Sequence, residues 1–274
     1  MTTHRDSSRA RAEAFAALHT PAAPLALANV WDVAGARLVE AAGAPAVATT
    51  SAGVAWSLGA ADGNALARER AVDLVARVAG AVGVPVTADI ESGFGADPAE
   101  VGETVAAVIA AGAVGINLED GAHEPAAYVE RLAAARAAAD AAGIPLYINA
   151  RIDTYLRGLG EPGPVRLAET LARAAAYREA GASGIFVPGV HEPAAVAELA
   201  AGIDAPLNVL AGPGAPSVAE LGALGAARVS LGSWVAEAAY ALVRRATEEL
   251  LAKGTYDALA GSLGYGELNG LFPR

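Results

Sequence analysis

Short apolar stretches alternate with longer alanine-rich stretches from residue 25 to residue 253. Each short stretch ends in a polar or glycine-rich loop, which predicts a buried strand followed by a connection. Each longer stretch has the length of a helix, and several end in a glycine suited to capping a helix. The predicted strands are 25–30, 46–50, 85–89, 114–119, 145–150, 184–188, 206–210 and 227–231, and the predicted helices are 33–42, 65–82, 98–111, 125–142, 164–180, 192–201, 216–223 and 234–253.

Eight strand–helix units within 274 residues predict an α/β protein with a single (β/α)8 barrel. A doubly wound sheet is the alternative, but it rarely needs eight such even repeats. No linker or shift in composition divides the chain, so one domain over 1–274 is expected. An N-terminal arm with a helix (1–20) precedes the first strand, and a C-terminal helical segment (234–274) follows the last one.

Composition narrows the class of protein. Hydrophobic residues make up 54% of the chain, enough for a large core, yet charges interrupt the alanine-rich runs and argue against a membrane span. No cysteine is present, which excludes disulfides, thiolate zinc sites and cysteine nucleophiles. A net charge of −11 without a basic stripe disfavours nucleic acid as a partner. The N-terminus lacks the apolar stretch of a secretory signal, so a cytoplasmic enzyme is expected.

Polar residues gather at the carboxyl ends of the predicted strands, where barrel enzymes bind their ligands. Asp89 and Glu91 follow the third strand, and their alternation lets both side chains face one site. Two carboxylates suit Mg²⁺ or Mn²⁺, although solvated acids at the start of a loop would give the same pattern. Further acids follow the fourth strand, and Arg151 follows the fifth. This pattern favours a divalent metal and an anionic substrate whose carboxylate meets Arg151.

Several motifs at these strand ends resemble the isocitrate lyase/phosphoenolpyruvate mutase superfamily. The matching segments are NVWDVAGARLVEAAG (29–43), TTSAGVAWSLGAAD (49–62), ADIESGFG (88–95), GINLEDG (115–121), NARIDTY (149–155) and the stretch 228–259. The order of the motifs and their placement at strand ends carry the resemblance, which extends over nearly the whole chain. It implies a metal-dependent enzyme that acts on a small carboxylate and binds Mg²⁺.

Carried over position by position, the resemblance implies Asp89 as the principal metal ligand, with Glu91 and Glu119 as further ligands. The family usually has Asp-x-Asp where this chain has Asp89 and Glu91, so a water-mediated role is expected for Glu91. Asp62 and Arg151 are expected to take part in catalysis, and Arg151 to bind the substrate as well. The other residues expected to bind substrate are Trp31, Ser51, Ala52, Gly53 and Asn208, with residues 51–53 acting through backbone N–H groups in a serine–glycine turn.

The segment EDGAHEPAAY (119–128), here called the gate segment, departs from the family pattern. Isocitrate and methylisocitrate lyases carry Lys-x-Cys there, and the mutases and phosphonopyruvate hydrolases carry a lysine and an asparagine. None of these residues is present in this gate segment, so the first two lyase activities are not expected. The sequence instead favours a lyase or decarboxylase of oxaloacetate-like 2-oxo or 2-hydroxy di- or tricarboxylates, working through a metal-stabilised enolate. His123 is the expected proton donor, with Tyr155 as the alternative.

Three other functions stay open at this point. AGPGAPS (211–217) and SLGS (230–233) resemble the phosphate cradle of barrels that bind phosphosugars. Carbon–phosphorus chemistry of the phosphonomutase or phosphonopyruvate hydrolase type is another possibility, and a non-catalytic barrel that binds a metabolite is the third.

Apolar residues continue through the C-terminal segment at helical spacing and must be buried on some surface. Members of the resembled superfamily exchange this helix between subunits. A homodimer or homotetramer built by exchange of the C-terminal helix is therefore expected.

Overall fold

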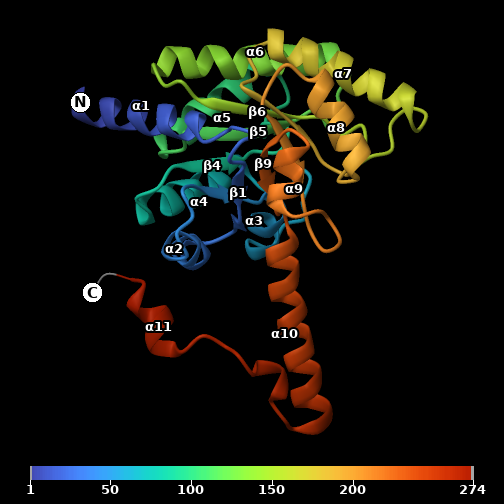
Figure 1. The fold of residues 1–274 in the computed structure, drawn as a ribbon. Coiled ribbons are helices and arrows are strands. Elements are labelled where there is room, and N and C mark those ends of the chain that lie inside the picture. Colours follow the sequence, from blue (N-terminus) through green and yellow to red (C-terminus); the bar gives the residue numbers. More distant parts are fainter. Residues whose placement is uncertain (1, 273–274) are drawn as a thin grey trace.

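The computed structural model describes residues 2–272 and shows a nearly closed parallel barrel surrounded by helices (Figure 1). The order of the strands around the barrel is β1-β9-β8-β7-β6-β5-β4-β3-β2. The predicted (β/α)8 barrel is confirmed, with the first predicted strand divided into β1 and β2. The described strands are β1 Leu25–Leu27, β2 Asn29–Val30, β3 Val47–Thr49, β4 Val86–Asp89, β5 Gly115–Glu119, β6 Tyr147–Arg151, β7 Gly184–Val187, β8 Leu207–Leu210 and β9 Ala226–Ser230.

The side chain of Asn29 closes the barrel where the first strand is divided. β1 pairs with β9 on one side and β2 pairs with β3 on the other. Asn29 donates to the carbonyl of Thr49 at 3.0 Å, and its Oδ1 accepts from the N–H groups of Leu231 and Gly232 at 3.1 and 3.0 Å. The buried amide therefore uses its hydrogen-bonding capacity to join the two ends of the sheet.

Helices follow the strands in alternation and cover the outside of the barrel (Figure 1). The first turns of α5, α6, α7 and α8 contain proline, which suits this position because the missing N–H has no intrahelical acceptor there. The described helices are α1 Thr2–Ala17, α2 Val33–Ala41, α3 Ser51–Ser57, α4 Arg68–Ala81, α5 Pro98–Ala110, α6 Pro125–Ala142, α7 Pro164–Glu179, α8 Pro193–Gly202, α9 Val218–Ala223, α10 Trp234–Lys253, η1 Asp257–Leu259 and α11 Tyr265–Gly270.

Helix α3 corrects one expectation, because residues 51–53 begin a helix where a serine–glycine turn was predicted. Gly53 has a structural reason other than a turn. A Cβ at this position would lie 2.8 Å from Cγ2 of Thr50 and 3.0 Å from Cβ of Trp31. Glycine is therefore required for close packing, although it lowers the intrinsic stability of the helix.

The barrel interior contains a polar layer beneath the carboxyl ends of the strands. Arg228 is completely buried, and its Nη2 donates to Oδ1 of Asn117 at 3.3 Å. Asn149 donates to the same oxygen at 2.9 Å. Burial lowers the pKa of Arg228 to about 10, as expected for a cation removed from water.

Phe15 of α1 and His19, which follows this helix, pack against Tyr147 at the amino end of β6. The ring of His19 stacks on Tyr147 with centroids 3.8 Å apart, and its Nδ1 lies 3.0 Å from the carbonyl oxygen of Phe15. Its Nε2 is buried without a hydrogen-bond partner. Burial, together with the charge of Arg228, lowers the pKa of His19 from 6.5 to about 4.

His19→Phe is expected to make unfolding less sensitive to acid. The unfolded chain binds a proton at His19 below about pH 6.5, whereas the folded protein binds it only below about pH 4. The wild type therefore loses stability as the pH falls from 6.5 to about 4. Linkage gives a loss of about 2 kcal/mol between pH 7.5 and pH 5. Urea unfolding of both proteins at these two pH values measures the difference, and an equal loss in the variant would contradict it.

The C-terminal segment leaves the barrel along α10, turns at η1 and returns to the barrel side with α11 (Figure 1). Near the end of the described chain, Arg37 of α2 donates to the carbonyl of Leu271 at 2.9 Å and lies over the ring of Phe272. Most of α10 faces solvent, with Ala236 as its buried residue. Within the described residues, no helix is long and apolar enough to cross a membrane.

Candidate active site

A cavity of about 180 Å³ opens at the carboxyl ends of the strands. It brings together five of the predicted site residues, which are Ser51, Ala52, Asp62, Asp89 and Arg151. The remaining lining residues come from seven strand ends or the loops after them: Asn29, Thr50, Asn117, Leu156, Phe186, Pro188, Leu210, Ser230, Gly232 and Ser233. The predicted position of the site is thus a real concavity of the fold.

Asp89 is fixed at the end of β4 by contacts with the neighbouring strand end. Its Oδ2 accepts from the backbone N–H of Ser51 at 3.0 Å, and its own N–H donates to Oγ1 of Thr49 at 2.8 Å. Ser51 begins α3, so its N–H belongs to the first turn of a helix, where backbone donors lack intrahelical acceptors. The next N–H along this turn, that of Ala52, is carried by a residue that also lines the cavity.

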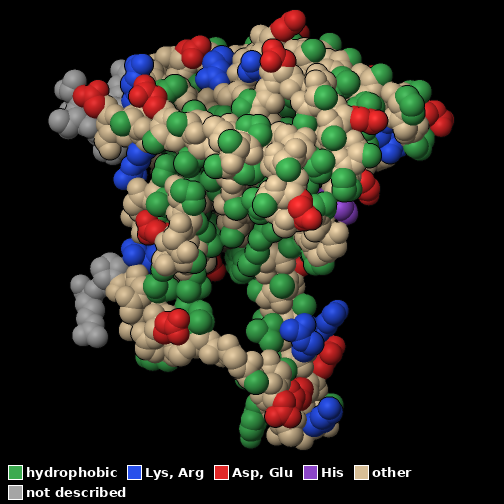
Figure 2. Space-filling view, in the orientation of Figure 1, with side chains coloured by type: hydrophobic (Ala, Val, Ile, Leu, Met, Phe, Trp, Pro, Cys, Tyr) green, Lys and Arg blue, Asp and Glu red, His purple; other side chains and the backbone are tan. Residues whose placement is uncertain are grey.

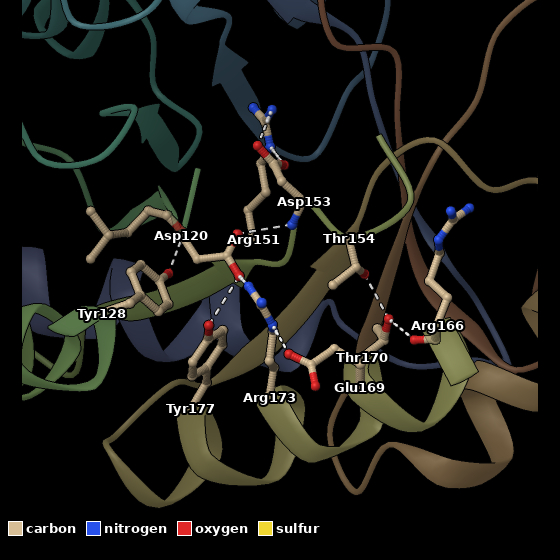
Figure 3. Close-up of polar contacts among 11 residues, drawn as sticks. Asp120, Tyr128, Arg151, Asp153, Thr154, Arg166, Glu169, Thr170, Arg173 and Tyr177 are labelled. Carbon is tan, nitrogen blue, oxygen red and sulfur yellow. Dashed lines mark hydrogen bonds and ion pairs between the residues drawn. The ribbon is translucent and has the colours of Figure 1, made fainter. Parts of the chain in front are cut away.

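Two acids contact the three nitrogens of the Arg151 guanidinium; the contact with Asp153 is drawn in Figure 3. Asp153 binds the guanidinium bidentately: Nε donates to Oδ1 at 2.6 Å, and Nη2 donates to Oδ2 at 3.2 Å. Nη1 lies 2.7 Å from Oε2 of Glu119. The two carboxylates raise the pKa of Arg151 despite burial. The guanidinium is therefore a fixed cation at the cavity wall, and its remaining N–H bonds are available to a ligand.

Glu91 and Glu119 lie behind the cavity wall rather than on it. Glu91 is 2% exposed and adopts φ of +51°, and one carboxylate oxygen accepts from the N–H of Asn64 while Oε1 has no partner. Burial raises the pKa of Glu91 to about 7, with the charges of Asp62 and Asp89 adding to the effect. Burial likewise raises the pKa of Glu119 to about 8, although Arg151 opposes this shift.

Asp62 completes the group of acids around the cavity. Burial raises the pKa of Asp62, and the charge of Asp89 raises it further, against an opposing hydrogen bond from Ser51. Asp62, Asp89, Glu91 and Glu119 thus interact through their charges, and Arg151 is the cation that faces them. The site therefore carries an excess of negative charge, and a bound divalent cation would remove it.

The acids around the cavity are suited to bind Mg²⁺ through one or two carboxylates. No three His, Cys, Asp or Glu side chains of the described chain converge as a complete ligand set. Mg²⁺ does not need one, because it commonly keeps several waters and takes one or two carboxylates plus oxygens of the substrate. Oε1 of Glu91 has no hydrogen-bond partner among the described residues, and burial raises the pKa values of Glu91 and Glu119, so a nearby cation would stabilise both carboxylates.

Other predicted site residues lie outside the cavity lining. Trp31 packs near Tyr240 of α10, with ring centroids 6.4 Å apart. Asn208 is buried below the cavity and accepts from Ser230 at 3.2 Å. His123 is half-buried in the gate segment, where its N–H donates to the carbonyl of Asp120. Gly53 supports the packing of α3, so its side of the helix faces protein.

Sequence reasoning missed Asn117 as a cavity residue. Asn117 and Glu119 alternate on β5 and therefore point to the same side of the strand, which was the available signal. The Oδ1 atom of Asn117 accepts from both Asn149 and Arg228. These two bonds fix the orientation of its amide at the cavity floor.

The proposed phosphate cradle finds little support in the geometry of α9. Ser217 and Glu220 form a capping box, in which the Glu220 carboxylate accepts from the N–H and the hydroxyl of Ser217. A carboxylate of the chain itself therefore occupies the end of the helix that would attract a phosphate. Ser230 and Ser233 line the main cavity instead.

The barrel and its acid-rich cavity define a (β/α)8 protein with a polar site on the face where such barrels carry out catalysis. The model of the phosphoenolpyruvate phosphomutase family matches residues 15–251, and the chain belongs to this family. The resemblance expected from the sequence is thereby confirmed. The family belongs to a superfamily of enzymes that includes both lyases and mutases.

Similar proteins include both uncharacterised and named members. An uncharacterised Mycobacterium tuberculosis protein is 38% identical over 80% of this chain and 81% of its own length. A Burkholderia cenocepacia J2315 structure, provisionally described as a lyase/mutase, is 38% identical with a TM-score of 0.89 over 98% of both chains. Escherichia coli 2-methylisocitrate lyase is 31% identical over 71% of this chain and 68% of the enzyme. Pseudomonas putida oxaloacetate decarboxylase 2 is 33% identical over 64% and 58%, respectively.

Proposed function

We propose that this protein is a Mg²⁺-dependent lyase or decarboxylase that cleaves a carbon–carbon bond in a small, oxaloacetate-like 2-oxo or 2-hydroxy di- or tricarboxylate. The observation that carries the proposal is the fixed guanidinium of Arg151 beside Asp89 in a cavity of about 180 Å³. A cavity of this volume admits only a small molecule. The names of the relatives support the class, because they include a decarboxylase and a lyase of small carboxylates.

Asp89 would hold the metal directly, and Glu91, Glu119 and Asp62 would hold it through water or shape its surroundings. When bound, Mg²⁺ supplies Lewis-acid stabilisation of the negative charge that develops on the 2-oxo oxygen. Arg151 binds the carboxylate next to that oxygen and orients it, because Asp153 and Glu119 prevent the guanidinium from rotating. The N–H of Ala52, in the first turn of α3 and at the cavity lining, would add a donor to the substrate.

Bond cleavage then needs a proton at the carbon that has lost its substituent. His123 and Tyr155 remain the candidates from the sequence, although neither lines the cavity. Tyr155 is half-buried with Arg166 over its ring, and His123 lies in the gate segment. A change in the gate segment on substrate binding would have to bring His123 to the cavity.

The proposal is tested by a substrate screen. Purified protein is incubated with oxaloacetate and related 2-oxo and 2-hydroxy diacids, with Mg²⁺ or with EDTA, and the release of pyruvate or the corresponding 2-oxo product is measured. Metal-dependent turnover of at least one diacid above the uncatalysed rate is the expected result. Turnover that continues unchanged in EDTA, or none with any member of the series, would overturn the proposal.

The composition of the gate segment leads to a separate prediction. We expect no measurable glyoxylate from isocitrate, and no pyruvate or succinate from 2-methylisocitrate, because the chain has no cysteine to act as the acid in this segment. Coupled assays for these products, run beside the diacid screen, measure this directly. Formation of these products would show that another residue replaces the cysteine.

Phosphonopyruvate is included in the screen as the second candidate substrate. It shares the 2-oxo carboxylate that Arg151 would bind, and the family to which the chain belongs takes its description from a phosphomutase. Release of inorganic phosphate, or formation of phosphoenolpyruvate, would favour carbon–phosphorus chemistry over the carbon–carbon cleavage proposed here.

A further inference from the structure

Asp120 is a completely buried carboxylate that lies behind the candidate site, between the end of β5 and α7 (Figure 3). Its Oδ2 accepts from Nη1 of Arg173 at 2.8 Å and from the hydroxyl of Tyr177 at 3.0 Å. Its Oδ1 accepts from the N–H of Asp153 at 2.9 Å. A buried carboxylate with three such donors has its acceptor oxygens satisfied, so the side chain is fixed in place.

The backbone of Asp120 adds a second connection to the same part of β6. Its N–H donates to the carbonyl of Arg151 at 3.0 Å, two residues before the N–H that its side chain accepts. Asp120 therefore binds the chain on both sides of Ile152. This segment carries Arg151 and the carboxylate of Asp153 that orients it, so the position of Asp120 sets the position of both.

Arg173 and Tyr177 lie one turn apart on α7 and approach Asp120 from the outer layer of the barrel. Arg173 also pairs with Glu169 at 2.8 Å, which holds its side chain along the helix. The site acids make no direct contact with these two residues. Helix α7 thus reaches the site through an unbroken series of hydrogen bonds, which runs from Arg173 and Tyr177 through Asp120 and Asp153 to Arg151.

We propose that Asp120, Arg173 and Tyr177 form a positioning cluster that fixes the guanidinium of Arg151 for the carboxylate of the substrate. The inference rests on the proposed function, in which Arg151 binds that carboxylate. Removing a cluster member leaves the fold and the reacting atoms in place but lets the Arg151–Asp153 segment shift. Substrate affinity falls for this reason, while the turnover of bound substrate changes little.

Tyr128 offers a matched control for Tyr177. The two rings pack together with centroids 4.5 Å apart, and both residues are completely buried. The Tyr128 hydroxyl, however, donates to the carbonyl of Leu118 rather than to Asp120. Tyr128→Phe and Tyr177→Phe therefore remove the same group from the same aromatic pair, and only the second removes a donor from the cluster.

Arg136 is the corresponding control for Arg173. It lies on α6 and donates to the carbonyls of Gly181 and Leu146. These hydrogen bonds do not belong to the series that leads to Arg151. Arg136→Met and Arg173→Met each remove a partly buried guanidinium from an outer helix. Arg173→Lys retains the charge beside Asp120 and serves as the rescue variant.

The experiment measures the affinity for oxalate by calorimetry in the presence of Mg²⁺, together with KM, kcat and the melting temperature. Arg173→Met is expected to weaken oxalate binding and raise KM about tenfold, with Tyr177→Phe smaller in the same direction. Arg173→Lys should recover part of the loss, and Tyr128→Phe and Arg136→Met should match the wild type in oxalate affinity. Equal oxalate affinities in all five variants, or equal losses in the two controls, would overturn the proposal.

Arg151→Lys distinguishes a failure of the positioning cluster from a failure of the proposed function. If Arg151→Lys weakens oxalate binding and the cluster variants do not, the positioning cluster is wrong and the proposed function stands. If the wild type binds no oxalate, or binds it equally well after Arg151→Lys, both are wrong. If Arg173→Met does not fold, Tyr177→Phe still tests the proposal, because the loss of one hydroxyl is the smallest change that removes a donor from the cluster.

Discussion

Asp89→Ala is expected to lower metal-dependent turnover by roughly 10³-fold, which is the size of loss seen when a group that stabilises developing charge is removed. Asp89 lies at the cavity wall and accepts one backbone N–H, from Ser51. Its other oxygen has no donor among the described residues. Because it reaches the cavity with one oxygen free of donors, Asp89 is the carboxylate best placed to hold a cation.

The same substitution should leave the fold intact. The charge of Asp89 contributes to the raised pKa values of Asp62, Glu91 and Glu119. Removing this charge relieves repulsion, so the melting temperature measured without metal should stay the same or rise. The affinity for Mn²⁺, followed by the loss of its free electron paramagnetic resonance signal, should fall with the activity.

Asp73→Ala is the control for Asp89→Ala. Asp73 is an acid on α4 with a side chain that is 61% exposed and paired with Arg77 at the surface. Its removal should change neither Mn²⁺ binding nor turnover, because exposed pairs contribute little. If Asp89→Ala retained full activity and full Mn²⁺ affinity, the metal site would have to be sought elsewhere in the chain.

The full-length protein is expected to form a homodimer, or a homotetramer of paired dimers, through its C-terminal segment. Large apolar side chains of this segment lie open to solvent in the single chain, with Val243 62% exposed, Leu251 81% and Tyr265 85%. Helix α10 extends away from the barrel before the chain returns with α11, and Figure 2 shows green apolar side chains along this segment. Apolar residues at this density are normally covered, and a second copy of the chain could cover them reciprocally.

Leu251→Glu tests this assembly. A buried leucine contributes roughly 1.5–3 kcal/mol, and a two-fold interface contains each residue twice, so one substitution should weaken dimerisation by about 10²-fold or more. Multi-angle light scattering at micromolar concentration should show a multiple of the monomer mass for the wild type and a shift toward monomer for the variant. Val165→Glu, at an apolar residue 59% exposed on α7, is the control that should leave the mass unchanged. A monomeric wild type would refute the exchange of helices.

The sequence by itself determined the barrel and the location of its site. Strands such as Gly184–Val187 are buried on both faces and form continuous apolar runs, so their number and spacing are visible along the chain. Residues at the carboxyl ends of the strands must converge in a barrel, and this alone predicts the shared cavity in which Asp89 and Arg151 lie. Predictions of this kind succeed because they depend on local burial and on chain connectivity.

Only the tertiary structure decided which side chains meet. The ion pair between Glu119 and Arg151 follows from the register of β5 and β6, in which these two residues lie side by side. Register depends on how the whole barrel closes, which no local pattern encodes. The same holds for the contact of Arg173 with Asp120, 53 residues earlier in the chain, and for His123, whose loop keeps it out of the cavity lining. The sequence could name the charged residues of the site, but the packing of strands and helices determined which of them reach the cavity and which hold the others in place.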